Sequence, residues 1–185
     1  MVLIHQSQGT GAGNYDVGVI LSVGPDTLVL EKPLQNAYEG ATYLYRANGE
    51  CEGRGMRGEY FNNVNLTGSS VLTRCDAQIR FGWEAGSPDG SLPADNFSVR
   101  WTGELYTPIS STYEFTVAAD DGFRFYIDDM VVPAFDRWTP PADATYVFSL
   151  SLSAGTHSVK VEYYEETGNA KLQLQSPTTS ARPQT

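Results

Sequence analysis

Apolar residues recur at every second position through most of the chain. Because side chains two residues apart lie on the same face of a β-strand, this alternation predicts strands. An amphipathic helix would need a 3.6-residue apolar period over about 11 residues, and that period is almost nowhere present. The alternating runs are Tyr113-Phe115-Val117, Phe123-Phe125-Ile127, Tyr146-Phe148-Leu150-Leu152, Val159-Val161-Tyr163 and Leu172-Leu174.

Short groups of Asp, Gly and Asn separate these runs, and such residues tolerate tight or left-handed turns. Asp128-Asp129 is typical of a hairpin turn, and the alternation around Trp101 in FSVRWTG predicts that this side chain lies in the core. Short strands at this spacing predict an all-β fold, either an antiparallel β-sandwich or a barrel. The other turn groups are Asp120-Asp121-Gly122, Ala154-Gly155 and Thr167-Gly168-Asn169.

The two ends of the chain differ from this central region. Residues 1–50 form a β-rich N-terminal segment that is too short to bury a core alone. The segment therefore either packs on the larger domain or is a partial module, the end of a preceding β-domain. Residues 176–185, SPTTSARPQT, have the Pro, Ser and Thr content of a linker-like tail.

Composition and charge exclude several classes of protein. The chain is 41% hydrophobic and 12% aromatic, which is too apolar for disorder. Its formal net charge is −10 without any cluster of Lys and Arg, so we expect no nucleic-acid partner. No apolar run approaches the roughly 18 residues that cross a bilayer, so we expect no membrane insertion. An acidic surface attracts divalent cations, which permits calcium binding.

The residues that could carry chemistry are few. Cys51 and Cys75 are the two cysteines, and the sequence leaves open whether they form one disulfide or remain two buried free thiols. His5 and His157 are isolated, with no second histidine at zinc-binding spacing. Nothing marks two carboxylates as a catalytic acid and base, so we expect that the chain is not an enzyme.

Four stretches of the chain together resemble the PA14 domain family. They are GEYFNN from Gly58, FGWEAGSPDGSLPADNFSVRWTGELYTP over 81–108, YEFTVAADDGFRFYIDD over 113–129 and LSAGTHSVKVEYYEETGNAKLQLQ over 152–175. The resemblance assigns residues 51–175 to a PA14-like domain. It implies a β-sandwich of secreted or cell-surface proteins, so the expected location is extracellular. In several adhesins and lectins of the family the domain binds sugar through calcium, whereas in others it serves assembly or processing.

The resemblance also implies a site. In the sugar-binding members two neighbouring acids, joined by a cis peptide, both bind calcium, and Asp120 and Asp121 occupy these positions here. Glu165 lies nearest to a position where calcium-dependent adhesins tend to offer Asn, so this chain departs from the family pattern there. Glu is an adequate oxygen ligand for calcium. The expected metal ligands are Asp120, Asp121 and Glu165, and the expected sugar contacts are Trp138, Glu166, Gly168 and Asn169.

Each of these residues also has a purely structural interpretation. Asp and Gly are good turn formers, so Asp120-Asp121-Gly122 can be a plain turn. Glu165 can be the solvated end of a hairpin, and Trp138 can cover the edge of the core rather than stack on a sugar ring.

Two functions therefore remain open from the sequence. The first is a calcium-dependent carbohydrate-binding module, lectin-like or adhesin-like, with Ca²⁺ as cofactor and glycans as partners. The second is a structural or assembly subunit, or a spacer, of a surface fibre or multidomain adhesin. In that case the β-rich N-terminal segment would pair with a neighbouring module or another copy of the chain.

Overall fold

The computed structural model describes residues 2–6, 15–18, 20–23, 28–33, 35, 42–46, 51, 55–139 and 143–179. In these ranges no helix is long and apolar enough to span a bilayer. The strands, in chain order, are β1 (Val2–Gln6), β2 (Tyr15–Gly18), β3 (Ile20–Val23), β4 (Leu28–Leu30), β5 (Thr42–Arg46), β6 (Met56–Phe61), β7 (Leu72–Asp76), β8 (Arg80–Glu84), β9 (Phe97–Thr107), β10 (Ser111–Asp120), β11 (Gly122–Ile127), β12 (Met130–Arg137), β13 (Ala144–Leu152), β14 (Gly155–Glu165) and β15 (Ala170–Thr179).

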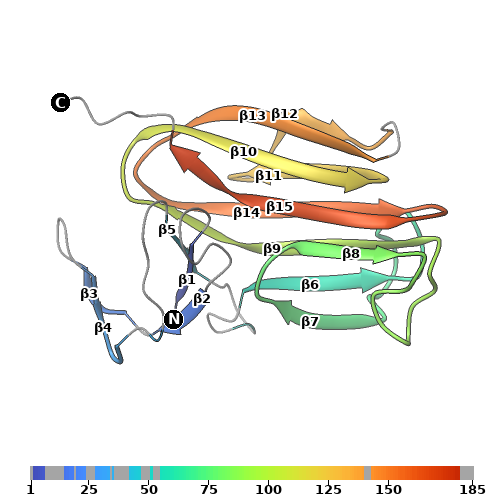
Figure 1. The fold of residues 1–185 in the computed structure, drawn as a ribbon, viewed down its shortest axis with the longest axis horizontal. Coiled ribbons are helices and arrows are strands. Elements are labelled where there is room, and N and C mark those ends of the chain that lie inside the picture. Colours follow the sequence, from blue (N-terminus) through green and yellow to red (C-terminus); the bar gives the residue numbers. More distant parts are fainter. Residues whose placement is uncertain are drawn as a thin grey trace.

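Two antiparallel sheets form the body of the molecule (Figure 1). The described strands of the larger sheet follow the order β12-β11-β14-β9-β5-β1-β2, with β6 paired to β9 and β7 paired to β6. The smaller sheet has the order β13-β10-β15-β8, and β3 and β4 form a separate hairpin. The chain passes between the two sheets at the turn from β10 to β11. This arrangement confirms the predicted all-β antiparallel sandwich.

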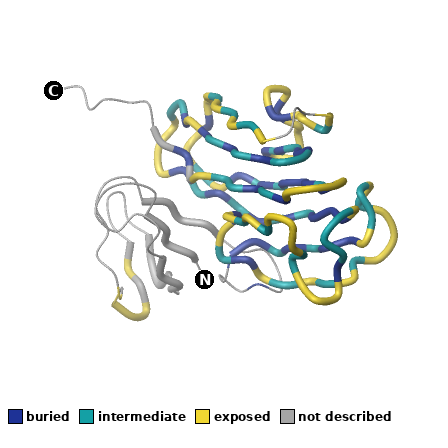
Figure 2. Tube along the Cα trace, turned by 45° about the vertical axis from the view of Figure 1, so that its right-hand side comes forward, coloured by how far each residue is buried: buried dark blue, intermediate teal, exposed yellow. Residues whose placement is uncertain are grey.

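The core lies between the sheets and follows the alternation that the sequence shows. On β10, Tyr113, Phe115 and Val117 are at most 2% exposed, while Glu114 between them is exposed. Phe123 and Phe125 of β11 are buried in the same way from the other sheet. Figure 2 shows the buried positions concentrated in the strands at the middle of both layers. The apolar face of each strand therefore points inward, as the period of two predicts.

A buried carboxylate lies at one end of this core. Asp76 on β7 is 7% exposed, and its Oδ2 accepts hydrogen bonds from the indole N–H of Trp101 at 2.7 Å and the hydroxyl of Tyr60 at 2.6 Å. Its Oδ1 accepts a hydrogen bond from Nε of Arg74 at 2.8 Å. A Cβ atom at Gly58 would lie 2.6 Å from Oδ2 of Asp76, so only glycine fits beside this cluster. Trp101 is fully buried, as its place in the strand pattern predicts.

The β-rich N-terminal segment continues the larger sheet. β5 pairs with the C-terminal half of β9, where Leu44 lies opposite Tyr106, and β6 pairs with the other half of the same edge. β1 then pairs with β5, and β2 with β1. The described strands of this segment thus extend the sandwich instead of forming a sheet apart, except for the β3–β4 hairpin.

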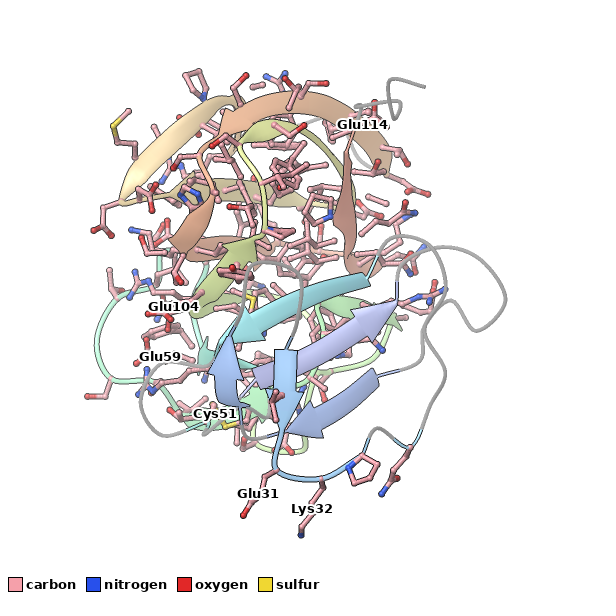
Figure 3. All side chains as sticks on the ribbon, turned by 90° about the vertical axis from the view of Figure 1, so that its left-hand side faces the viewer. Glu31, Lys32, Cys51, Glu59, Glu104 and Glu114 are labelled. Atoms are coloured by element: carbon pink, nitrogen blue, oxygen red, sulfur yellow. A yellow bond between two sulfur atoms is a disulfide. The ribbon has the colours of Figure 1, made fainter. Side chains whose placement is uncertain are left out.

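The structure also shows a disulfide near the start of the larger domain and a long strand at its end. The sulfur atoms of Cys51 and Cys75 form a disulfide, with the two Cα atoms 5.4 Å apart. Figure 3 labels Cys51, and the disulfide ties it to β7, on which Cys75 lies. At the other end, β15 runs to Thr179, four residues into the predicted linker-like tail. The strand continues because, after a register shift, Thr178 and Thr179 still lie opposite residues of β10.

A row of alternating charges crosses the outer face of the larger sheet. In the strand registers, Asp136 lies opposite Arg124, Arg124 opposite Glu162, Glu162 opposite Arg100, and Arg100 opposite Glu59. The Nε atom of Arg100 donates to Glu162 at 3.0 Å, and that of Arg124 donates to Asp136 at 2.9 Å. Glu59, labelled in Figure 3, ends the row. Opposite charges on neighbouring strands stabilise this register of the sheet.

Candidate functional site

The paired acids of the sequence stand where the chain crosses from one sheet to the other. β10 ends at Asp120 and β11 begins at Gly122, so Asp121 alone lies between the strands. The peptide bond between Asp120 and Asp121 is cis. A Cβ atom at Gly122 would lie 2.0 Å from a ring carbon of Tyr164, so the chain can leave this turn only through glycine. The two carboxylates therefore share one short, tightly packed turn.

A second turn, between β14 and β15, is held beside the acids by hydrogen bonds from its backbone. The N–H of Glu166 donates to Oδ2 of Asp121 at 2.8 Å. The N–H of Gly168 donates to Oδ1 of Asp95, on the segment before β9, at 3.1 Å. The N–H of Asn96 donates in turn to the carbonyl oxygen of Glu166 at 3.1 Å. Three loops that are distant in sequence thus meet at one end of the sandwich.

Glu165, the last residue of β14, is buried at this meeting point. It is 0% exposed, and its Oε2 lies 3.0 Å from the hydroxyl of Tyr163. Its Oε1 has no hydrogen-bond partner among the described residues. A buried carboxylate oxygen without a partner is costly. Among the described residues of the three loops, Oε1 of Glu165 is the buried side-chain atom that lacks one. The interpretation of Glu165 as a solvated hairpin end does not fit this burial.

The electrostatic environment keeps a proton on Glu165. The pKa of Glu165 is raised to about 8, mainly by burial and also by the nearby carboxylates of Asp121, Asp120 and Asp95, while the hydrogen bond with Tyr163 acts in the opposite direction. The Tyr163 hydroxyl has one proton and lies within hydrogen-bonding distance of two acceptors, the carbonyl oxygen of Asp120 and Oε2 of Glu165. The same concentration of negative charge would attract a cation.

Two aromatic side chains border the acids on the outer face of the larger sheet. The rings of Trp138 and Tyr164 have centroids 4.9 Å apart, and the hydroxyl of Tyr164 donates to the carbonyl oxygen of Trp138 at 2.8 Å. The guanidinium of Arg124 lies 4.3 Å from the centre of the Trp138 ring. Trp138 is half-buried between these neighbours, which restricts the ring surface that it could offer a sugar.

The structure brings most of the sequence-predicted site residues together. Asp120, Asp121 and Glu165 lie at the same loops, and Glu166, Gly168 and Asn169 are exposed along the adjoining turn. The Trp138 ring packs on Tyr164, whose ring lies against Gly122 beside the acids. In the described part of the chain, no three His, Cys, Asp or Glu side chains converge closely enough to form a metal-binding group. The three predicted ligands are therefore neighbours without being gathered around one point.

Two residues of this site, Asp95 and Tyr163, are not among the site residues that the sequence analysis names. Asp95 is 73 positions from Gly168, its hydrogen-bond partner, so only the fold reveals the contact. Tyr163 could have been found, because it lies two residues before Glu165 on β14 and must face the same side of the strand. Its hydroxyl links β14, the turn at Asp120 and the N–H of Lys171 on β15.

Comparisons with known proteins show which family, sequences and structures this chain is similar to. A family model described as the PA14 domain matches residues 53–184. The anti-sigma-I factor RsgI3 of Acetivibrio thermocellus is 36% identical over 123 residues, which is 66% of this chain and 19% of that protein. A solved anti-sigma factor domain-containing protein is 33% identical with a TM-score of 0.61, and the match covers 68% of this chain and 45% of that one.

A second solved structure comes from a different kind of protein. It is titled a PA14 sugar-binding domain from an RTX adhesin, with a TM-score of 0.54, 21% identity, and coverage of 65% of this chain and 88% of that one. At 21% identity, this similarity shows that the two chains share a fold. The chain spans about a fifth of the curated relative and less than half of the solved anti-sigma factor chain.

Proposed function

The chain belongs to the PA14 domain family, and we propose that it is a calcium-dependent carbohydrate-binding module without catalytic activity. The observation that carries this proposal is the buried, unpartnered Oε1 of Glu165 beside Asp120 and Asp121. A divalent cation would satisfy that oxygen and offset the repulsion between the three acids. The family membership favours the same position for the ion.

The residues present fit calcium by their chemistry. Ca²⁺ takes about six to eight oxygen ligands and accepts carboxylates, backbone carbonyls and water in flexible geometry. Asp120 and Asp121 would supply carboxylates from one turn, and Glu165 a third from the end of β14. Because these side chains do not converge in the structure, the proposal requires Glu165 to lose its proton and the three carboxylates to draw together when the ion binds. When bound, the ion supplies coordination sites for sugar hydroxyl groups.

The exposed turn after β14 would make the remaining contacts with the sugar. Glu166 and Asn169 have exposed side chains that can accept or donate hydrogen bonds to hydroxyl groups, and Gly168 leaves space beside them. Because Asp121 and Asp95 already hold the backbone of this turn, little ordering is needed when a ligand binds. Trp138 would contribute the part of its ring that Arg124 and Tyr164 leave uncovered.

The similar proteins support parts of this proposal. The RTX adhesin domain is named as sugar-binding and shares the fold. Membership of the PA14 family favours a role outside the cell or at its surface. The proposed ligand class is thus a glycan in the extracellular medium.

A second proposal concerns the protein in which the module works. Two relatives that are more than 30% identical are named as anti-sigma factors, and both are longer than the part that matches. We infer that the module is the ligand-recognising part of an anti-sigma factor. Co-purification of a sigma factor with the full-length parent protein would support this inference, and the absence of any bound sigma factor would contradict it.

A glycan array probed with and without calcium tests the first proposal. The chelator-treated chain should give no signal, and addition of Ca²⁺ should restore binding to a defined set of glycans. Replacement of both Asp120 and Asp121 by Ala should abolish that signal while circular dichroism shows an intact β-sandwich. A glycan signal that persists in chelator, or in this double variant, would contradict the proposal.

A further inference from the structure

β13 is an edge strand that carries none of the features by which proteins protect sheet edges. In the described part of the chain it pairs with β10 alone, over nine consecutive residues without a register shift. Its sequence, ATYVFSLSL, contains no charged residue, proline or glycine. A long, regular and uncharged edge is a template for pairing with another strand. In Figure 1, β13 lies at the outer end of the sandwich, together with β12.

Two other edges of these sheets, β12 and β8, are protected. β12, the neighbouring edge of the larger sheet, contains Pro133 and the charged residues Asp136 and Arg137, and its pairing with β11 shifts register. β8, the opposite edge of the smaller sheet, has five residues that include Arg80 and Glu84, and its pairing with β15 also shifts register. Proline, charge, short length and bulges all oppose added strands. β13 is therefore exceptional among these three edges.

The core is also incompletely covered along β13. Tyr146, Phe148 and Leu150 face the core but are only half-buried. The residues that face the same way on β10, such as Tyr113 and Phe115, are at most 2% exposed. An added strand beside β13 would cover the remaining apolar surface of its three inward-facing side chains. The hydrophobic effect thus favours an extended sheet at this edge.

The outer face of β13 indicates which partner fits. Its exposed residues are small or uncharged, and Val147 is 58% exposed at their centre. The chain as a whole has a net charge of −10, so two copies repel each other over most of their surfaces. β13 itself contributes no charge to this repulsion. The outward-facing residues are Thr145, Val147, Ser149 and Ser151.

From these observations we propose that β13 pairs antiparallel with β13 of a second copy of this chain. The twofold axis passes through Phe148, so that the two smaller sheets join into one continuous sheet. This register keeps the inward-facing residues of both copies together on the core side and the uncharged outward-facing residues together on the outer side, as an isologous contact requires. The resulting pairs are Phe148 with Phe148, Tyr146 with Leu150, Val147 with Ser149, and Thr145 with Ser151.

Sedimentation equilibrium of the full chain from about 1 to 500 µM tests this proposal. The wild-type chain should pass from monomer to dimer in that range. A Val147→Lys/Ser149→Lys variant places lysines opposite lysines across the twofold axis, and it should weaken dimerisation at least tenfold. The matched control is Val131→Lys/Ala134→Lys on β12, which adds the same charge at the neighbouring edge and should dimerise at least as strongly as the wild-type chain.

Hydrogen exchange gives a second readout at the level of single residues. On passing from low to high concentration, backbone N–H groups of β13 that point away from β10 should become protected, and those of β12 should not. A wild-type chain that stays monomeric at the highest concentration would overturn the proposal. A dimer that persists unchanged in the β13 lysine variant, with a folded circular dichroism spectrum, would also overturn it.

Discussion

Oδ2 of Asp121, on the turn between β10 and β11, lies 2.8 Å from the backbone nitrogen of Glu166, on the turn between β14 and β15. One member of the acid pair therefore already has a structural role: it holds the second loop in place. Asp121 therefore has two properties to distinguish, its negative charge and its ability to accept this hydrogen bond. The two can be removed independently by substitution.

Asp121→Asn should keep the fold and lose calcium. The amide oxygen of Asn can still accept the hydrogen bond from Glu166, whereas the charge that binds the ion is gone. Asp121→Ala removes both, so it should also destabilise the chain by about 1 kcal/mol, the usual contribution of one hydrogen bond. Urea unfolding in chelator and calorimetric titration with Ca²⁺ measure the two effects. Equal stability of the two variants would contradict the role of this contact.

Glu165→Gln should stabilise the calcium-free protein and weaken its binding of calcium. Without calcium, it removes an acidic group from a fully buried position next to three other acids, so the melting temperature should rise by roughly 2–4 °C. With calcium, it removes a charged ligand, so the affinity should fall at least about tenfold, or about 1.4 kcal/mol. Thermal melts in chelator and in excess Ca²⁺ test both. An unchanged calcium affinity would exclude Glu165 as a ligand.

Asp76→Ala should destabilise the sandwich more than any change at the candidate site. The substitution leaves the indole N–H of Trp101 and the hydroxyl of Tyr60 without their acceptor and removes the partner of Arg74. Loss of one partner from a buried ionic cluster costs about 3–5 kcal/mol. Denaturant unfolding measures this loss, with Glu114→Ala, at an exposed position, as a control that should change stability by at most about 0.5 kcal/mol. A cost of the same size for both would refute the cluster's role.

His157 should make stability depend on pH. Burial opposes its protonation, but the carbonyl oxygen of Ser153 and the carboxylate of Asp128 both attract its proton and raise the pKa of His157 above its ordinary value. Both ring nitrogens face acceptors, so the charged form alone satisfies both. Because the pKa of His157 is higher in the folded than in the unfolded state, protonation of His157 stabilises the fold. This stabilisation is fully present below the unfolded-state pKa of about 6.5 and is lost as the pH rises through the folded-state pKa.

The variant that tests this contribution is His157→Gln. The difference in free energy of unfolding between the wild-type chain and the variant should be largest near pH 5.5 and should shrink as the pH is raised to 8.5. Urea unfolding at intervals of half a pH unit gives that difference directly. A difference that is constant, or that grows with pH, is the outcome at odds with a charged His157.

The sequence predicts the fold well because strand alternation is local. The period of two along β10 and β14 determines which side chains face the core, and Asp128-Asp129 forms the predicted turn. The site is harder to predict. The contact of Asp95 with Gly168 depends on how β9 and β15 are placed by the whole sandwich, and the burial of Glu165 depends on Tyr163 and on three loops closing over it. No local pattern encodes these relations.

The pairing of the N-terminal strands is another feature that local sequence patterns do not predict. Sequence analysis finds β-rich pieces in residues 1–50 but leaves open whether they pack on the larger domain or belong to another module. The answer depends on β9, whose 11 residues are long enough for both β6 and β5 to pair along one edge. Strand length can be estimated from the pattern, whereas the partner on each side of the strand cannot.

Calorimetric titration of the chelator-treated chain with Ca²⁺ tests the central claim most directly. The account predicts one binding site per chain, loss of that site in an Asp120→Ala/Asp121→Ala variant that retains its fold, and release of up to one proton per ion at pH 7 because Glu165 must ionise to bind. Heats no larger than those of the double variant would contradict the claim, and the acids around Glu165 would then have a structural role alone.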